Sequence, residues 1–529
     1  MKRKVKVIIT IVLSAVILIG ALVILSKIFT PKKISHVSTR STWNGYYYDT
    51  EDELDVIFCG PSPVYYGILP TELYDRYGIT SYDVSSPSMR MEFIKVYVEE
   101  ALRTKDVSLV VVETNLYSSY SYDLLEGMTR TTLDNMKLSL PKLKGIVHTL
   151  QKSTLDQSFL SYIFPLLRYH DRWTELTEED FAFLENNWDG YMKGSSPGSA
   201  IRHYSQSTVD SHIVVNEGGV DTNYDEENEE ALREIAALCK EKGVELLAIR
   251  MPNLKGVTTG QTAGTKKLCD ELGIEFLDCS NKEVWEEIGL DGTMDFTSAA
   301  HLNITGSDKF TTYIGKYLSE HYDFTGAADE ETKARWEEAV TEARLDILER
   351  LGASAGKNYE VTSKTGCISY CNNIDGTLTV SWPMLSYTES VSLYREEADG
   401  TGRTLLLENA ADLESFTDTD YDTLKEYNYI LAYQVKGTDE VQEVSCHVEL
   451  PFRIRKSTRA KVRLDWNLFS GNGTYTLVRL TEEGEKVIYE GKTNLTAAGK
   501  NMKKDSTYIL RYSDGESTAE FSVLFEYGD

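Results

Sequence analysis

Two residues that lie far apart in the sequence have the types needed for nucleophilic catalysis. Ser62 follows a short apolar run and lies in the turn Gly60-Pro61-Ser62-Pro63, where Gly60 permits a tight bend. A serine nucleophile needs a base, and histidine is the usual one. Of the eight histidines, only His301 follows the last strand expected in the N-terminal half and shortly precedes its final helix. If the two turns meet at one sheet edge, Ser62 and His301 can act as nucleophile and base; a serine after a strand more often has only a structural role.

The elements that would position this pair are short apolar runs that alternate with helical patterns. Buried strands are expected at 54–59, 108–113, 244–250 and 274–277. Helices are expected at 92–103, 229–242, 265–272 and 309–321. This alternation predicts an open parallel sheet covered on both faces, and such sheets place their sites at the carboxyl ends of the strands. Residues 116–228 are expected to form a partly helical insertion.

The N-terminal segment has the composition of a membrane anchor. Val7 to Leu25 carries no charge and would span about 28 Å as a helix, enough for a bilayer core. Four basic residues precede this run and three follow it, which slightly favours a cytoplasmic N-terminus. The alternative is a cleaved signal peptide, but the run is long for one and Ser26-Lys27-Ile28 is a poor cleavage site. We therefore expect a single-pass cell-membrane protein with its body extracellular.

Beyond about residue 360 the apolar pattern has the period of β-strands. Alternation around Trp382 recurs around Trp466, 84 residues later, which is about the length of one small β-sandwich. The predicted parts are a cytoplasmic tail (1–6), a transmembrane anchor (7–28), a stalk (29–53), an α/β domain (54–323), a helical connector (324–359) and two sandwiches (360–453 and 454–529). The sandwiches resemble fibronectin type III or related immunoglobulin-like modules.

Charge and motif content exclude several classes of function. The net charge is −28, and because residues 1–33 hold seven basic and no acidic residues, the remainder carries −35. Such a body repels phosphate backbones, so no nucleic-acid partner is expected. Seven cysteines are too few for a disulfide scaffold. No phosphate-binding loop, dinucleotide fingerprint or zinc-protease motif is present, and we expect no cofactor and no metal.

Five segments together resemble the SGNH/GDSL hydrolase superfamily, in its branch of single-anchor bacterial surface proteins. That branch includes the D-alanine transfer protein of teichoic-acid modification and the alginate-type O-acetyltransferases. The matching segments are DVIFCGPSPVYYGILP (55–70), YGITSYDVSSPSM (77–89), SLVVVE (108–113), YIFPLLRYHDRW (162–173) and DFTSAAHLNITGSDKFTTYIGKYL (295–318). The resemblance covers residues 54–323 and implies a three-layer, flavodoxin-like α/β fold.

The resemblance also implies roles for individual residues. Ser62 matches the nucleophile of the family and His301 its base. The aspartate that orients the base usually lies three residues earlier, where this chain has Ser298, a poorer group for holding the imidazole. Asp295 can substitute for it if the loop curls, and a backbone carbonyl is another possible orienting group.

Other site roles follow from the same resemblance. The oxyanion donors are expected to be the N–H of Ser62, Ser85 or its neighbour Ser86 at the position of the second-block glycine, and the amide of Asn115. His170, Arg172 and Trp173 could bind substrate, because aromatic faces and arginine suit sugars and carboxylates. The alternative for this segment is a packed helix end.

Two functions from different classes remain open on the sequence. The first is an enzyme that acylates Ser62 and passes the acyl group to a cell-wall or capsular polysaccharide or to water. Its expected partner, implied by the family, is a membrane-bound acyl carrier or O-acyltransferase. The second is a catalytically impaired glycan-binding or scaffold protein of the cell envelope, which Ser298 and the two prolines beside Ser62 favour.

Overall fold

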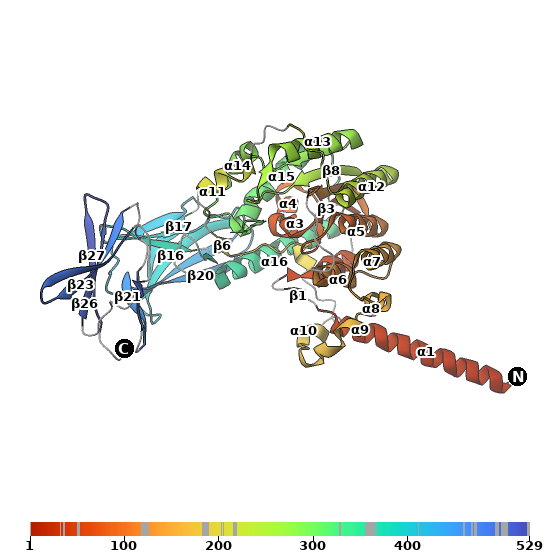
Figure 1. Cartoon of the computed structure of the whole chain (residues 1–529), viewed down its shortest axis with the longest axis horizontal. Helices are drawn as coiled ribbons and strands as arrows, with labels where there is room; N and C mark the ends of the chain where they lie inside the picture. The colour runs from red at the N-terminus through yellow and green to blue at the C-terminus, as the bar shows by residue number, and fades with distance from the viewer. Residues whose placement is uncertain are drawn as a thin grey trace. The chain divides into compact units, whose positions relative to one another are not determined.

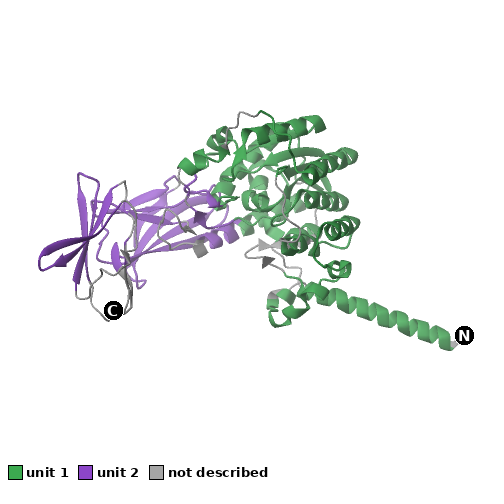
Figure 2. Ribbon diagram, viewed as in Figure 1, with its two compact units in different colours: residues 1–197, 207–290, 299–343 green, residues 198–206, 291–298, 344–529 purple. Residues whose placement is uncertain are grey.

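A computed structural model describes most of the chain and divides it into two compact units (Figure 2). The first comprises residues 1–197, 207–290 and 299–343, and the second comprises 198–206, 291–298 and 344–529. The residues outside the description are 1, 32, 35–36, 50–52, 118–125, 182–189, 203, 205, 215–218, 327–328, 355–363, 366–367, 411, 459–460, 467–468, 470–472, 492–496, 499–505 and 526–529.

A five-stranded parallel sheet forms the centre of the first unit. Its strands are β3 (Glu53–Gly60), β4 (Ser81–Ser85), β5 (Asp106–Glu113), β8 (Glu245–Arg250) and β10 (Glu275–Asp278). Their spatial order is β10-β8-β5-β3-β4, and every neighbouring pair is parallel. The chain therefore adds β4 on one side of β3 and then crosses to the other side to form β5. The predicted α/β sheet is confirmed at this level.

Helices cover both faces of the sheet (Figure 1). Ile57 and Cys59 of β3 belong to one apolar core with residues of α5 (Met91–Thr104) and α12 (Glu226–Lys242). Alternate residues point to the other face, where α3 (Ser62–Gly67) and α4 (Pro70–Tyr77) contact β4. Both short helices also contact α15 (Ile304–His321). The remaining helices of the sheet region are α13 (Thr259–Leu272) and α14 (Lys282–Ile288).

The insertion between β5 and α12 contains mostly short helices. They are α6 (Glu126–Asp134), α7 (Leu140–Lys152), α8 (Phe159–Ile163), α9 (Leu166–Tyr169), the 3-10 helix η1 (His170–Thr174), α10 (Glu178–Phe181), the 3-10 turn η3 (Gly190–Met192) and α11 (Gln206–Asp210). Short strand pairs accompany them, β7 (Ile213–Val214) with β9 (Val257–Thr258) and β6 (Ile201–Arg202) with β13 (Lys364–Thr365).

At the N-terminus, α1 (Lys2–Phe29) is followed by β1 (Lys33–Ile34), β2 (Val37–Ser38) and α2 (Thr39–Tyr48). Among the described residues, α1 is the one helix long and apolar enough to cross a membrane. Its side chains are exposed from Val7 to Leu25, apart from the half-buried Leu22. An anchor and a signal sequence share this length and composition.

The second unit contains two β-sandwiches, each with one three-stranded and one four-stranded antiparallel sheet. The two sheets of the first sandwich have the strand orders β14-β15-β18 and β17-β16-β19-β20. Its strands are β14 (Ser369–Asn372), β15 (Leu378–Ser381), β16 (Thr388–Glu397), β17 (Thr404–Ala410), β18 (Ser415–Asp418), β19 (Tyr427–Val435) and β20 (Val441–Val448). The two sheets of the second sandwich have the strand orders β21-β22-β25 and β24-β23-β26-β27. Its strands are β21 (Phe452–Thr458), β22 (Lys461–Trp466), β23 (Thr474–Thr481), β24 (Gly484–Gly491), β25 (Ala497–Ala498), β26 (Ser506–Ser513) and β27 (Thr518–Phe525). Trp382 and Trp466 are buried in these sandwiches. The helix α16 (Glu330–Ser354) precedes them in the chain.

Candidate active site

Ser62 and His301 meet at the carboxyl edge of the parallel sheet. The Oγ atom of Ser62 lies 2.7 Å from Nε2 of His301, although 239 residues separate the two in sequence. Ser62 is the first residue of α3, directly after β3, and His301 lies in the short strand β12 (His301–Leu302), directly before α15. The distance is that of a hydrogen bond in which the hydroxyl donates to a neutral imidazole.

The turn that carries Ser62 depends on Gly60. A Cβ atom on Gly60 would lie 2.7 Å from Cγ2 of Val64 and 2.9 Å from Cβ of Glu113. The missing side chain therefore lets α3 begin immediately against the end of β5. Pro63 falls in the first turn of α3, where a backbone N–H has no intrahelical acceptor, so the proline stiffens the turn without removing a helical hydrogen bond.

His301 has the properties of a base that is neutral at neutral pH. Burial lowers its pKa to about 4, and the positive charge of Lys255 adds to this effect. The imidazole ring stacks on Tyr66 of α3, with ring centroids 4.5 Å apart and planes inclined by 27°. In the tautomer whose Nε2 carries no proton, the stacked ring can accept the hydroxyl proton of Ser62.

Asp295 has a local structural role in a turn. It is fully buried and lies in the segment Asp291–Ser298, which belongs to the second unit. Its Oδ2 atom accepts a hydrogen bond of 2.7 Å from the N–H of Asp291, and its own N–H donates to the carbonyl of Asp291 at 2.9 Å. These bonds close the turn that leads into β11 (Phe296–Ser298). That Asp295 or Ser298 orients His301 stays a prediction.

Ser85 and Asn115 occupy the ends of the strands on either side of β3. Ser85 is the last residue of β4 and lies opposite Gly60 in the parallel ladder. Its side chain is buried, and its Oγ atom makes no hydrogen bond among the described residues. Asn115 follows β5 by two residues and its side chain is exposed. The neighbour Ser86 is instead engaged with Thr132, at 3.1 Å between their hydroxyl oxygens. The oxyanion role of Ser85 and Asn115 stays a prediction.

Glu113 is a site residue that the sequence interpretation did not assign. It ends the central strand β5 and is only 7% exposed, and its buried Oε2 atom has no hydrogen-bond partner within the described part of the chain. Burial raises its pKa to about 8, against the lowering effects of Lys255 and Arg250. At neutral pH the group is therefore a carboxylic acid that can donate a hydrogen bond. An acidic residue that ends the run SLVVVE was the signal for it.

The sheet order explains why these groups collect here. The strand that follows β3 in the chain is added on one side of it, and the later strands are added on the other side, beginning with β5. Open α/β sheets bind ligands in the crevice at such a switch point, which here lies between β3 and β5. Gly60 and Glu113 end the two strands that flank this point, and the parallel sheet thereby gathers Ser62, His301 and Glu113 near its carboxyl edge.

The segment predicted to bind substrate lies beside the apolar N-terminal helix. His170, Arg172 and Trp173 form the 3-10 helix η1, which contacts α1. The guanidinium of Arg172 donates to the carbonyl of Phe29 at 2.5 Å and lies 3.4 Å from the carboxylate of Asp180. Trp173 is 70% exposed. These contacts give Arg172 a part in fixing the end of α1, and substrate binding by this segment stays a prediction.

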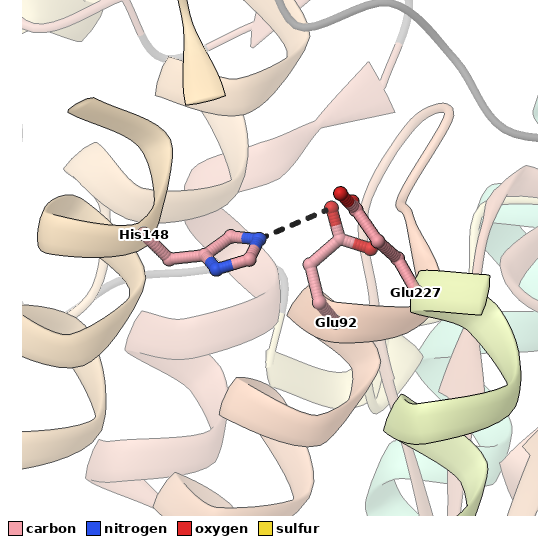
Figure 3. Close-up of side chains that lie close together, drawn as sticks. All are labelled: Glu92, His148 and Glu227. Carbon is pink, nitrogen blue, oxygen red and sulfur yellow. Dashed lines mark ion pairs between the residues drawn. The ribbon is translucent and has the colours of Figure 1, made fainter. Parts of the chain in front are cut away.

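A second cluster of polar side chains joins three helices on the α5 face of the sheet. Glu92 of α5, His148 of α7 and Glu227 of α12 present ligand-type atoms within 4.8 Å of one another (Figure 3). Two cations already neutralise the carboxylates. Arg90 pairs with both Glu92 and Glu227, and Lys152 lies 2.5 Å from Glu227. A metal ion would have to displace these cations, so the cluster acts as an ion-pair network that ties the helices together.

Solved structures similar to this chain include fibronectin type III domains. No protein-family model and no curated protein matches the chain. The alpha chain of the chicken interferon gamma receptor is 13% identical, with 30% of this chain and 96% of that one covered and a TM-score of 0.14. Two fibronectin type III domains of chicken tenascin give 13% identity, coverages of 30% and 97%, and a TM-score of 0.14. The description of the two sandwiches as fibronectin-like rests on their sheet orders, a three-stranded and a four-stranded antiparallel sheet in each. The resemblance of residues 54–323 to SGNH hydrolases gains no support from these comparisons and stays a prediction.

Proposed function

We propose that the chain is a membrane-anchored serine acyltransferase or esterase of SGNH type, acting outside the cytoplasm on a cell-surface polysaccharide. The observation that carries the proposal is the 2.7 Å contact between Ser62 Oγ and His301 Nε2. The low pKa of His301 leaves the base unprotonated at neutral pH, and the same low pKa makes the imidazole a weak proton acceptor until a substrate or an orienting group raises it. The sheet order supports the proposal: with its strands numbered along the chain it reads 2-1-3-4-5, which flavodoxin-like folds share.

In the first half-reaction Ser62 receives the acyl group. The Oγ atom bonds to the carbonyl carbon, the hydroxyl proton passes to Nε2 of His301, and the carbonyl π electrons move to the oxygen. The tetrahedral intermediate then expels the leaving oxygen, which takes the proton from His301. The N–H of Ser62 and the carboxylic acid of Glu113 are the donors we assign to the developing oxyanion.

In the second half-reaction an acceptor removes the acyl group. A polymer hydroxyl or a water molecule gives its proton to His301 and attacks the acyl carbon, and Ser62 leaves as it regains a proton. A hydroxyl acceptor makes the protein a transferase and water makes it an esterase. A body outside the cytoplasm has no direct access to activated thioesters, so we propose a membrane-bound acyl carrier as the partner that supplies the group.

The experiment is ester hydrolysis by the full-length protein in detergent, with p-nitrophenyl acetate as substrate. Ser62→Ala and His301→Ala are each expected to lower the rate of ester hydrolysis above the uncatalysed background by about 10²- to 10⁴-fold. Ser319→Ala, on the exposed side of α15, is the matched control and should retain the wild-type rate. Equal rates in all four proteins would refute the proposal.

Ser298 favours a second function. It stands where the resemblance expects the orienting aspartate, and a serine stabilises an imidazolium poorly. On this alternative the α/β domain binds a glycan and the sandwiches extend it through the cell envelope. Wild-type protein that is folded, inactive and still retained by immobilised cell-surface polysaccharide would establish the binding role instead.

A further inference from the structure

Large apolar side chains are exposed on four consecutive short helices of the insertion. On α8, α9, η1 and α10, the exposed fractions are 56% for Leu160, 49% for Leu167, 70% for Trp173 and 47% for Phe181. Phe159 is also exposed. Single exposed apolar residues are common, but several on adjoining elements mark an interaction surface.

Of these helices, α9 and α10 lie beside the body end of α1 (Figure 1). The helix α1 contacts α9, η1 and α10. The N–H of Leu166 donates to Oγ of Ser26 at 3.3 Å, and Arg172 donates to the carbonyl of Phe29. The surface is therefore fixed to the last turns of the apolar helix through hydrogen bonds as well as packing.

The burial pattern of α1 marks where the body begins. From Val7 to Leu25 its side chains are exposed apart from the half-buried Leu22, and Ser26 and Thr30 are then buried by the protein. If the uncharged run Val7–Leu25 fills the hydrocarbon core, Ser26 lies at its edge. The helices bonded to Ser26 and Phe29 then lie at the depth of the lipid headgroups, where tryptophan is enriched.

We propose that the surface formed by Phe159, Leu160, Leu167, Trp173 and Phe181, the interfacial patch, rests in the bilayer interface beside α1. It inserts its apolar side chains among the upper acyl chains, as interfacial helices do. Arg168 of α9 is paired with Glu126 at 3.1 Å, and Asp171, Glu175 and Glu178 nearby in the chain are exposed acids. The patch therefore binds lipid through its apolar side chains and not through attraction to anionic headgroups. The acidic Asp180 is paired with Arg172, which reduces the repulsion. The inference rests on α1 as a bilayer span and not on the reaction at Ser62.

Quenching of tryptophan fluorescence by brominated lipid tests the proposal. The full-length protein is reconstituted in phosphatidylcholine–phosphatidylglycerol vesicles whose phosphatidylcholine carries bromine near the carbonyl end of its acyl chains. The helix α1 contains no tryptophan, so quenching requires a tryptophan of the body at the bilayer. We expect Trp173→Phe to remove most of the quenching, and Trp285→Phe, which changes a buried residue, to leave it unchanged.

A second variant tests whether the leucines of the patch insert into the lipid together with Trp173. Leu160→Ser with Leu167→Ser should weaken quenching of Trp173 while the circular-dichroism melting temperature stays unchanged, because both leucines are exposed. Quenching that is the same in wild type and Trp173→Phe would overturn the proposal and leave the patch to a protein partner. Stronger quenching of Trp173 by lipid brominated near the methyl end would also overturn it, since that would place the residue in the bilayer centre.

Discussion

At the scale of single residues, the site depends on a base that is kept neutral by its surroundings. Burial and the charge of Lys255 both oppose protonation of His301. A protonated His301 cannot accept the proton of Ser62, so on the acid side activity should fall as the pH drops toward about 4, the pKa of His301. The acid limb of the kcat/KM profile for p-nitrophenyl acetate measures this value.

Replacement of Lys255 should move that limb. Lys255→Met removes a positive charge whose effect is to lower the pKa of His301, so the acid limb is expected to shift to higher pH with little change in the plateau rate. Lys316→Met, at an exposed position of α15, serves as control. An unshifted limb in Lys255→Met would show that the charge does not act on the base.

Glu113 gives the folded protein a pH-dependent stability. Its pKa rises from 4.5 to about 8 on folding, so between these values the unfolded chain has released a proton that the folded chain keeps. Stability should therefore fall as the pH rises through this window, at about 1.4 kcal/mol per pH unit at most. Glu113→Gln removes this contribution.

The measurement is urea unfolding of the wild type and Glu113→Gln at about pH 5 and about pH 8. The variant should gain stability relative to the wild type at the higher pH. A difference between the two proteins that does not vary with pH would mean that Glu113 is ionised in the folded protein, and its proposed donation to the oxyanion would fail with it.

At the scale of elements, one close approach controls the position of the nucleophile. Gly60 has no space for a Cβ atom between Val64 and Glu113. Gly60→Ala should displace α3 from β5, cost about 1–3 kcal/mol of stability, and separate Ser62 from His301. Gly127→Ala, on α6, has no atom within 4 Å of its added Cβ and is the matched control. Thermal melts and ester hydrolysis of both variants test this, and full activity in Gly60→Ala would contradict it.

Strands with continuous apolar runs could be predicted from the sequence, and polar or capped elements could not. The runs at 54–59, 108–113 and 244–250 match β3, β5 and β8 within two residues. The strand β4 (Ser81–Ser85) was not predicted, because Ser81, Asp83 and Ser85 are polar although buried. The final helix begins at Ile304 rather than 309, since the Asn303 side chain accepts the N–H of Gly306 as an N-cap.

The candidate site also has features that could be predicted from the sequence and features that could not. The meeting of Ser62 and His301 followed from the rule that parallel strands share one carboxyl edge. The pKa values, the stacking of Tyr66 and the burial of Glu113 depend on packing between distant segments, which no local pattern encodes. Residues 291–298 group with the second unit, a long-range association that was equally hidden from the sequence.

At the scale of the whole molecule, the chain joins an apolar helix, an α/β unit and tandem β-sandwiches in a strongly acidic protein of net charge −28. If α1 is an uncleaved anchor, the intact mass of the protein from native membranes should include residues 2–29, and protease added outside the cell should digest the body. Alkaline carbonate should not extract it. A mature protein that begins near residue 30 would show that α1 is a signal sequence and would remove the anchor from the account.

The central claim is that Ser62 is a nucleophile activated by His301. The most direct measurement is to treat native membranes, which retain any partner, with a fluorophosphonate probe and to locate the adduct by peptide mass spectrometry. We predict a single phosphonate on the peptide that contains Ser62, and none in His301→Ala. An unmodified Ser62 peptide in protein that is folded and in its membrane would contradict the claim and favour a binding role for the α/β unit.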